Sequence, residues 1–218
     1  NSARFRSQFK KSISKLSQAG LMAQAQYDID YSTPSAGCTA LTDDPESANS
    51  YTICAIFNGV LSGHVMTTTP PKLKDGETDY APADPGVTVS SPIYLSLADG
   101  SLVVFSRDMT ACHKTISGTV TGQNCEAFID VNGTTLPNSQ VSCQQAAGGE
   151  GEQQQGQQGQ GQEGQGQEGQ GQEGQGGGVT VPQTTCMVPN DANHMTDIVP
   201  VIFHDATVEP LTEAARYV

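Results

Sequence analysis

The residue types that most often perform catalysis are present in this chain, but none follows a known catalytic pattern. The histidines lie far apart and show no HExxH or comparable spacing; they are His64, His113, His194 and His204. The chain has no GxSxG elbow, no P-loop and no GxGxxG that follows a strand and opens a helix. Ser, His and Asp occur in any chain of this length, so their presence alone does not indicate a triad. We therefore expect no enzymatic activity.

The cysteines are the other chemically distinctive residues, and their spacing favours disulfides over metal binding. Their number is even, and no two of them form a CxxC pair. Several pairings remain open, and we expect the local one, in which neighbours along the chain are joined. The expected pairs are Cys38 with Cys54, Cys112 with Cys125, and Cys143 with Cys186. Disulfides require an oxidising compartment, so we place the protein outside the cytoplasm.

Residues 144–178 interrupt what is otherwise a domain-sized chain. The tract consists almost entirely of Gly, Gln and Glu and repeats a GQGQE pentamer. It has too few apolar side chains to offset the entropy lost when its backbone becomes ordered. We expect a disordered surface loop, tied at its base by the third disulfide, that serves as a hydrated spacer; ligand binding by the loop is the alternative. The roughly 180 remaining residues suffice for a single core.

The net charge of −13 is unevenly distributed along the chain. Five of the ten basic residues lie within the first fifteen positions, and the first acidic residue is Asp28. These basic residues are Arg4, Arg6, Lys10, Lys11 and Lys15. The strongly acidic body argues against nucleic acid as a partner. The basic start either faces anionic lipid or an acidic neighbouring subunit, or it is simply a solvated helix face.

Residues 1–31 have the pattern of an amphipathic helix, which would be roughly 45 Å long. The apolar residues recur at helical spacing, with Gly20 in the same stripe; they are Phe5, Phe9, Ile13, Leu16, Ala23 and Tyr27. The helix should end near Asp30, because Thr33, Pro34 and Gly37 break the pattern. Basic side chains at a helix N-terminus are unfavourable, so we expect the helix to be the lower part of one that begins upstream. No apolar run in the chain is long enough to span a bilayer, and no signal peptide is present, so any membrane segment is expected upstream as well.

The rest of the chain predicts short antiparallel strands. We expect strands at residues 51–61, 93–97, 102–106, 127–131 and 198–203. Asn58-Gly59 is expected to turn the first of these back into residues 60–66, and Pro200 suggests an edge position or a bulge in the last. Residues 67–86 read as an extended loop, and residues 208–218 as either a strand or a helical tail.

These elements predict an α+β fold in which the long helix lies across one face of an antiparallel sheet. Its contact face would contain Phe9, Ile13, Leu16 and Tyr27. The alternative is a helix that packs only on copies of itself, as in a coiled coil. We divide the chain into the helix, a β-rich body, the Gln/Gly/Glu loop and C-terminal strands that complete the same domain; their bounds are residues 1–31, 32–143, 144–178 and 179–218.

The late part of the chain adds a motif. The segment 128–133 reads Phe-Ile-Asp-Val-Asn-Gly and is followed by Pro137-Asn138. Together with the truncated amphipathic helix and the hairpin sheet, it resembles the type IV pilins and the pseudopilins of type II secretion. In many prepilin-like proteins an Asp-x-Asn-Gly turn precedes Pro-Asn and then an Asp that opens an apolar strand, which here would be Asp197. This chain departs from the pattern by its long Gln/Gly tract before Asp197, and Pro189-Asn190 is an alternative to the first Pro-Asn.

The resemblance implies a bacterial filament subunit that assembles through its N-terminal helix and displays an acidic, disulfide-bonded β domain. The assembly face of the helix would consist of Phe5, Phe9, Ile13, Leu16 and Tyr27. Its partners would be other pilin or pseudopilin subunits, with inner-membrane anchoring through the upstream segment before assembly. It would then lie in the periplasm or on the cell surface. A secreted or surface adhesin, binding glycans or host protein, is the alternative function.

The resemblance also implies a calcium site, as in the comparable loop of some pseudopilins. The candidate ligands are Asp130, Asn132 and Asp197, which offer hard oxygen atoms. Because calcium takes six or more oxygens, carbonyl groups or water would have to complete the shell, and the EF-hand pattern is absent. An ordinary Asn-Gly turn is the alternative.

Overall fold

The computed structural model describes residues 2–47, 51–82, 85–135, 140–144, 183–187 and 196–211. The chain forms two compact units, one made of Asn1–Val141 with Cys186–Val218 and the other of Ser142–Thr185. A long helix and an antiparallel sheet are the main elements of the described residues, which confirms the α+β prediction. The Gln/Gly/Glu tract predicted at residues 144–178 lies almost wholly outside the described residues.

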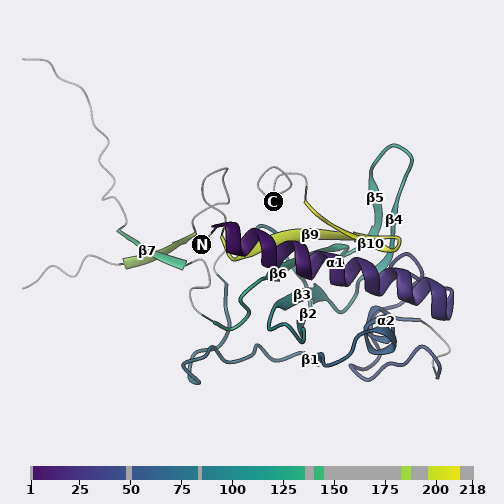
Figure 1. Ribbon diagram of the computed structural model, residues 1–218, viewed down its shortest axis with the longest axis horizontal. Helices are drawn as coiled ribbons and strands as arrows, with labels where there is room; N and C mark the ends of the chain where they lie inside the picture. Colours follow the sequence, from purple (N-terminus) through teal and green to yellow (C-terminus); the bar gives the residue numbers. More distant parts are fainter. Residues whose placement is uncertain are drawn as a thin grey trace, which may run out of the picture. The chain divides into compact units, whose positions relative to one another are not determined.

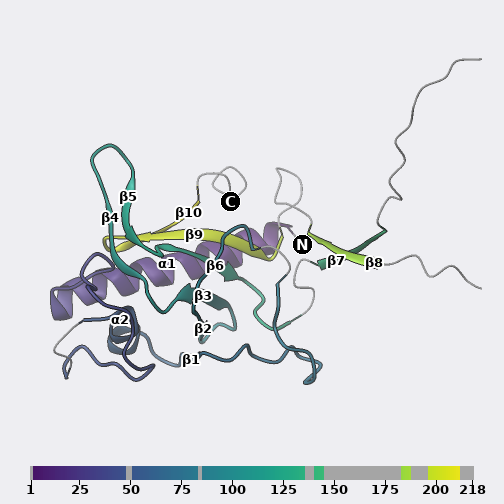
Figure 2. The ribbon, with the colours of Figure 1, turned by 180° about the vertical axis from the view of Figure 1, so that it is seen from behind.

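Helix α1 (Ser2–Tyr27) runs along one face of the main sheet, in front of it in Figure 1 and behind it in Figure 2. Its inward face is made of buried residues at helical spacing, which are Phe9, Ser12, Leu16, Ala19, Gly20 and Ala23. Phe5, Ile13 and Tyr27 are partly buried against the same core. The helix ends at Tyr27 rather than near Asp30 because Asp28 adopts a left-handed conformation with a φ of 55°.

The main sheet is entirely antiparallel, with the strand order β1-β2-β3-β6-β9-β10. Its strands are β1 (Val65–Thr67), β2 (Pro92–Ser96), β3 (Leu102–Ser106), β6 (Glu126–Asp130), β9 (Ile198–His204) and β10 (Thr207–Pro210). The strands predicted at residues 93–97, 102–106, 127–131 and 198–203 are therefore confirmed as β2, β3, β6 and β9. The undecided C-terminal segment begins as strand β10, and residues 212–218 lie outside the described part.

Two smaller ladders accompany the main sheet. Strands β4 (Thr110–Lys114) and β5 (Val120–Gln123) form a hairpin that projects beyond the sheet (Figure 1). Strands β7 (Gln140–Gln144) and β8 (Gln183–Met187) pair with each other.

Both faces of the main sheet are covered, so its central strand β3 is buried along its whole length. Alternate side chains of a strand point to opposite faces. Val103 and Phe105 join the core cluster that includes α1, whereas Leu102 and Val104 join a second cluster on the other face. Tyr80, from the long loop predicted at residues 67–86, closes this second cluster.

The strand predicted at residues 51–61 is wrong, because this segment forms helix α2 (Ile53–Val60). The Thr52 hydroxyl caps the helix by accepting a hydrogen bond from the Ala55 N–H (3.2 Å). A short apolar run is compatible with either a buried strand or a buried helix, and packing decides between them. Asn58-Gly59 is accordingly not a hairpin turn but the last turn of α2, and β1 pairs with β2 instead.

Pro200 occupies a local edge, although β9 lies between β6 and β10 in the sheet order. The last register pair between β9 and β10 joins Val201 to Pro210, so Pro200 lies beyond the end of β10. The Leu211 N–H donates to the Pro200 carbonyl from that side at 3.1 Å. The missing N–H of proline therefore falls beyond the last register pair of the β9–β10 ladder.

Two of the three expected disulfides are formed, namely Cys38–Cys54 and Cys112–Cys125. The first ties the loop after α1 to α2, and the second closes the base of the β4–β5 hairpin. The expected pair Cys143–Cys186 involves side chains outside the described part of the structure. The two observed disulfides indicate an oxidising, extracytoplasmic environment.

Candidate functional site

The structure brings the three candidate calcium ligands together at one end of β6 and β9. Asp130 is the last residue of β6, and Asp197 immediately precedes its register partner Ile198. The Val131 N–H donates to the Asp197 carbonyl at 2.9 Å, which holds the two segments in place. Both aspartates are buried, with exposed fractions of 0% and 2%.

Asn132 lies in the tight turn that follows Asp130. The Gly133 N–H donates to the Asp130 carbonyl at 3.2 Å, and Gly133 has a φ of 59°. A Cβ atom on Gly133 would lie 2.3 Å from the Gly100 carbonyl oxygen, so only glycine fits. The turn packs tightly against the β2–β3 hairpin and fixes where Asn132 lies relative to the aspartates.

The environment of the two carboxylates disfavours their charged forms. Burial, followed by the charge of Asp197, raises the pKa of Asp130 to about 8. Burial raises the pKa of Asp197 to about 6. Tyr80 donates its hydroxyl proton to Asp130 Oδ2 at 2.9 Å, and the Asn132 N–H donates to Oδ1 at 3.3 Å. These two hydrogen bonds lower the pKa of Asp130, but they offset only part of the increase that burial causes.

The donor set fits a hard divalent cation by type. Both carboxylate oxygens of Asp197 are buried, and neither accepts a hydrogen bond of ordinary geometry from the described residues. The side-chain amide of Asn132 is close enough to lower the pKa of Asp197, against the larger effect of burial. No group of three or more His, Cys, Asp or Glu side chains among the described residues is arranged to hold a metal. A cation here would therefore be held by two carboxylates and one amide oxygen, with carbonyl groups or water as further ligands.

A second polar cluster, which the sequence did not predict, joins β4 to the β9–β10 turn. His113 Nδ1 lies 2.6 Å from Asp205 Oδ1, and His204 Nδ1 lies 3.0 Å from Asp205 Oδ2. His204 Nε2 lies 2.8 Å from Glu209 Oε2, which also accepts from Lys114 Nζ at 3.2 Å. Two of the four scattered histidines thus meet through one aspartate. The spacing of such residues along the chain gives no signal for this arrangement.

The electrostatics of this cluster favour its carboxylates in the charged form. The hydrogen bond from His204 lowers the pKa of Glu209, with a further contribution from Lys114. Burial acts to raise the pKa of Asp205, but hydrogen bonds from His113, the Lys114 N–H and His204 outweigh it, so the pKa is lowered. The cluster holds the projecting hairpin against the sheet, and we assign it a structural role.

Of the remaining histidines, His64 lies in the segment between α2 and β1, where its Nε2 is 2.9 Å from Asn58 Oδ1. His194 lies outside the described residues.

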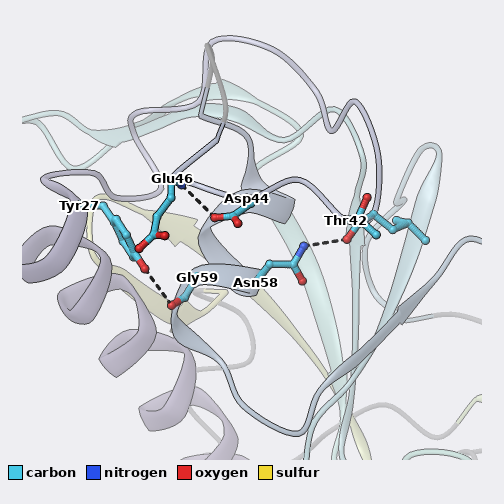
Figure 3. A pocket seen from close by; sticks show the side chains of 7 residues that line it. Tyr27, Thr42, Asp44, Glu46, Asn58 and Gly59 are labelled. Carbon is cyan, nitrogen blue, oxygen red and sulfur yellow. Dashed lines mark hydrogen bonds between the residues drawn. The ribbon is translucent and has the colours of Figure 1, made fainter.

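A pocket of about 470 Å³ opens at the C-terminal end of α1 (Figure 3). It is lined by Tyr27, Leu41, Thr42, Asp44, Glu46, Asn58 and Gly59. The Tyr27 hydroxyl is 3.5 Å from the Gly59 carbonyl, and Asn58 Nδ2 donates to the Leu41 carbonyl at 2.8 Å. A Cβ atom on Gly59 would lie 2.6 Å from Pro45 Cγ and 3.1 Å from Tyr27 Cε2. Glycine at this position therefore allows the tyrosine ring to lie against α2.

The predicted assembly face of α1 is occupied by the protein's own core. Phe9 and Leu16 are fully buried, and Phe5, Ile13 and Tyr27 pack around them. In this conformation, contacts between α1 and another subunit would use its outward face.

Neither helix in the described part of the chain has the length and apolar character needed to cross a membrane. Comparison of the chain with protein-family models, with curated proteins and with solved structures gives no significant match.

Proposed function

We propose that this protein is a structural subunit of an extracytoplasmic filament, of the type IV pilus or type II secretion pseudopilus kind. One observation carries the proposal. The Asp130–Gly133 turn and Asp197 are distant in sequence, but they meet at the paired ends of β6 and β9. The long N-terminal helix lies across the sheet that contains these two strands. This is the arrangement that the prepilin-like motif would require. The proposal makes other subunits of the same filament the partners of this chain.

The mechanism under this proposal is packing rather than catalysis. The inward stripe of α1 holds the sheet, while the outward face of the helix and the acidic body remain for contacts with neighbouring subunits. The two disulfides restrain the loop beside α2 and the β4–β5 hairpin, which are surface features that a filament would display.

The proposal can be tested in the cells that express the gene. An antibody raised against the purified chain should label filaments in immunogold electron micrographs, and the chain should co-sediment with filaments sheared from the cells. Recovery of the chain only as a free secreted protein, with selective binding on a glycan array, would instead support the adhesin alternative.

We also propose that Asp130, Asn132 and Asp197 hold a calcium ion. The support is the buried carboxylate of Asp197 next to a second buried carboxylate, with no Lys or Arg ion pair to either among the described residues. A bound cation would offset the charge of both groups and would hold the Asp130–Gly133 turn against the start of β9. The effect of calcium on thermal stability provides the test, which is described in the Discussion.

A further inference from the structure

Basic and acidic residues occupy separate stretches of the chain, and the fold places these stretches on two separate surfaces. The first fifteen residues contain only basic charged side chains. Residues 16–71 contain no Lys or Arg and five acidic residues, which are Asp28, Asp30, Asp43, Asp44 and Glu46. The basic segment is the N-terminal half of α1, and the acidic residues belong to the segments that follow its C-terminal end.

Three of the five basic side chains of α1 are exposed on its N-terminal half. Arg4, Lys10 and Lys11 are exposed on α1, and none of them forms an ion pair with another described residue. Their stretch of α1 begins at the end marked N in Figure 1, and α2 lies near the opposite end of the helix.

The acidic surface surrounds the pocket at Tyr27. Asp44 and Glu46 line the pocket, Asp28 follows the last residue of α1, and all three are exposed without an ion pair among the described residues. The nearby cation Arg107 is already engaged, since it donates to the carbonyls of Cys38 and Thr39 at 2.9 Å.

Two further features give the pocket a preference for a cation. The C-terminal end of a helix carries partial negative charge, and α1 has no basic residue in its last turn to offset it. The ring of Tyr27 forms one wall of the pocket, with the Glu46 side chain on the same side and Thr42 on the other (Figure 3). An aromatic ring beside carboxylates is a favourable environment for an ammonium or guanidinium group.

We propose that this pocket accepts a lysine side chain, Lys10 or Lys11, from α1 of a second copy of the chain. One copy cannot fill its own pocket, because Lys11 and Tyr27 lie roughly 24 Å apart along the helix axis at 1.5 Å per residue. The contact joins two different surfaces, so it is heterologous and can repeat into an open, head-to-tail assembly. The inference deepens the proposed filament function and rests on it.

Zero-length carbodiimide cross-linking tests the contact directly, because it joins a lysine amine to a carboxylate that touches it. A mixture of unlabelled and ¹⁵N-labelled chain is cross-linked and analysed by mass spectrometry. We expect mixed-isotope cross-links between Lys10 or Lys11 and Asp44 or Glu46. If the mixed-isotope cross-links leave out these carboxylates, the contact is wrong.

Charge reversal provides the second test. Lys10→Glu/Lys11→Glu and Asp44→Lys/Glu46→Lys should each weaken self-association, measured by sedimentation, roughly tenfold, and mixing the two variants should restore it. The matched control Lys72→Glu/Lys74→Glu changes the net charge by the same amount as the first variant, in the 67–86 loop rather than on α1, and should have little effect. Equal loss of association in the control would attribute the effect to general repulsion and would overturn the contact.

The results of these experiments distinguish a failure of the proposed contact from a failure of the proposed filament function. Filaments that are labelled in cells but lack these cross-links would leave the filament proposal intact and remove the contact. Cross-links that form in a protein never found in filaments would support the contact and remove the filament function.

Discussion

Asp130 and Asp197 occupy one buried site at the ends of β6 and β9, and neither forms an ion pair with a Lys or Arg side chain among the described residues. Two adjacent buried carboxylates cannot both remain charged at low cost. Either a proton or a cation must offset the charge, and the two possibilities predict different responses to pH and to calcium.

In the presence of EGTA, the pair should make the protein less stable as the pH rises. The pKa of Asp130 is raised to about 8 in the folded state, whereas an exposed aspartate has a value of 3.8. The folded state therefore holds the proton more tightly, and its advantage is full below about pH 4 and is lost as the pH approaches 8. Urea midpoints measured across this range should fall more steeply for the wild type than for Asp197→Asn, because the variant lacks the neighbouring charge that raises the Asp130 pKa. Parallel curves would show that the pair is not coupled.

Calcium should reverse this loss of stability. At pH 8, where both carboxylates are most ionised, millimolar CaCl₂ should raise the melting temperature above that in EGTA; saturation at a hundred times the Kd stabilises by about 2.7 kcal/mol. The increase should disappear in Asp197→Asn and persist in the control Glu77→Gln, which alters an exposed side chain in the 67–86 loop. An identical melting temperature with calcium and with EGTA would contradict the metal site.

Gly20→Ala should destabilise the protein although alanine is the better helix former. The new Cβ atom would lie 2.6 Å from the Ala206 carbonyl oxygen, so α1 could no longer approach the β9–β10 turn. We expect a cost of about 1–3 kcal/mol from overpacking, which exceeds the gain of about 1 kcal/mol in helix propensity. Chemical denaturation measures the difference, with Ser14→Ala on the exposed face of α1 as the control. A rise in stability would show that this close approach is absent in solution.

Thr52→Ala should weaken α2 by about 1 kcal/mol, the usual cost of losing a helix N-cap. The Thr52 hydroxyl also donates to Asp43 Oδ2 at 2.7 Å, so its loss removes two hydrogen bonds, although Asp43 Oδ2 still accepts one from the Thr39 N–H at 2.8 Å. Thr52→Ser keeps the hydroxyl and should retain most of the stability. Equal denaturation midpoints for the Ala and Ser variants would rule out the cap as a source of stability.

The hairpin of β2 and β3 could be predicted because its signal is local. Short apolar runs on both sides of an Asp-Gly turn predict the two strands without reference to the rest of the chain. Residues 51–61 are equally apolar, but the strand predicted there is a helix in the structure. There the choice depends on the Thr52 cap and on a buried surface formed by distant residues such as Phe105 and Phe203.

The candidate sites, too, could be predicted from the sequence only in part. The motif resemblance named Asp130, Asn132 and Asp197 together, but the burial of both aspartates became visible only in the folded chain. The contact of His113 and His204 with Asp205 could not be inferred, because it joins two segments that lie far apart in the sequence.

The sequence by itself determined the long amphipathic helix, four of the six strands of the main sheet, two of the disulfide pairs and the separation of basic from acidic segments. Each of these depends on residues that are close together in the chain, where helical spacing, alternation or turn chemistry acts directly. Tertiary structure alone decided that residues 53–60 are helical, that two aspartates share a buried site, and that the inward face of α1 is filled by its own sheet. These outcomes depend on which distant surfaces exclude water from one another, and local spacing carries no information about that choice.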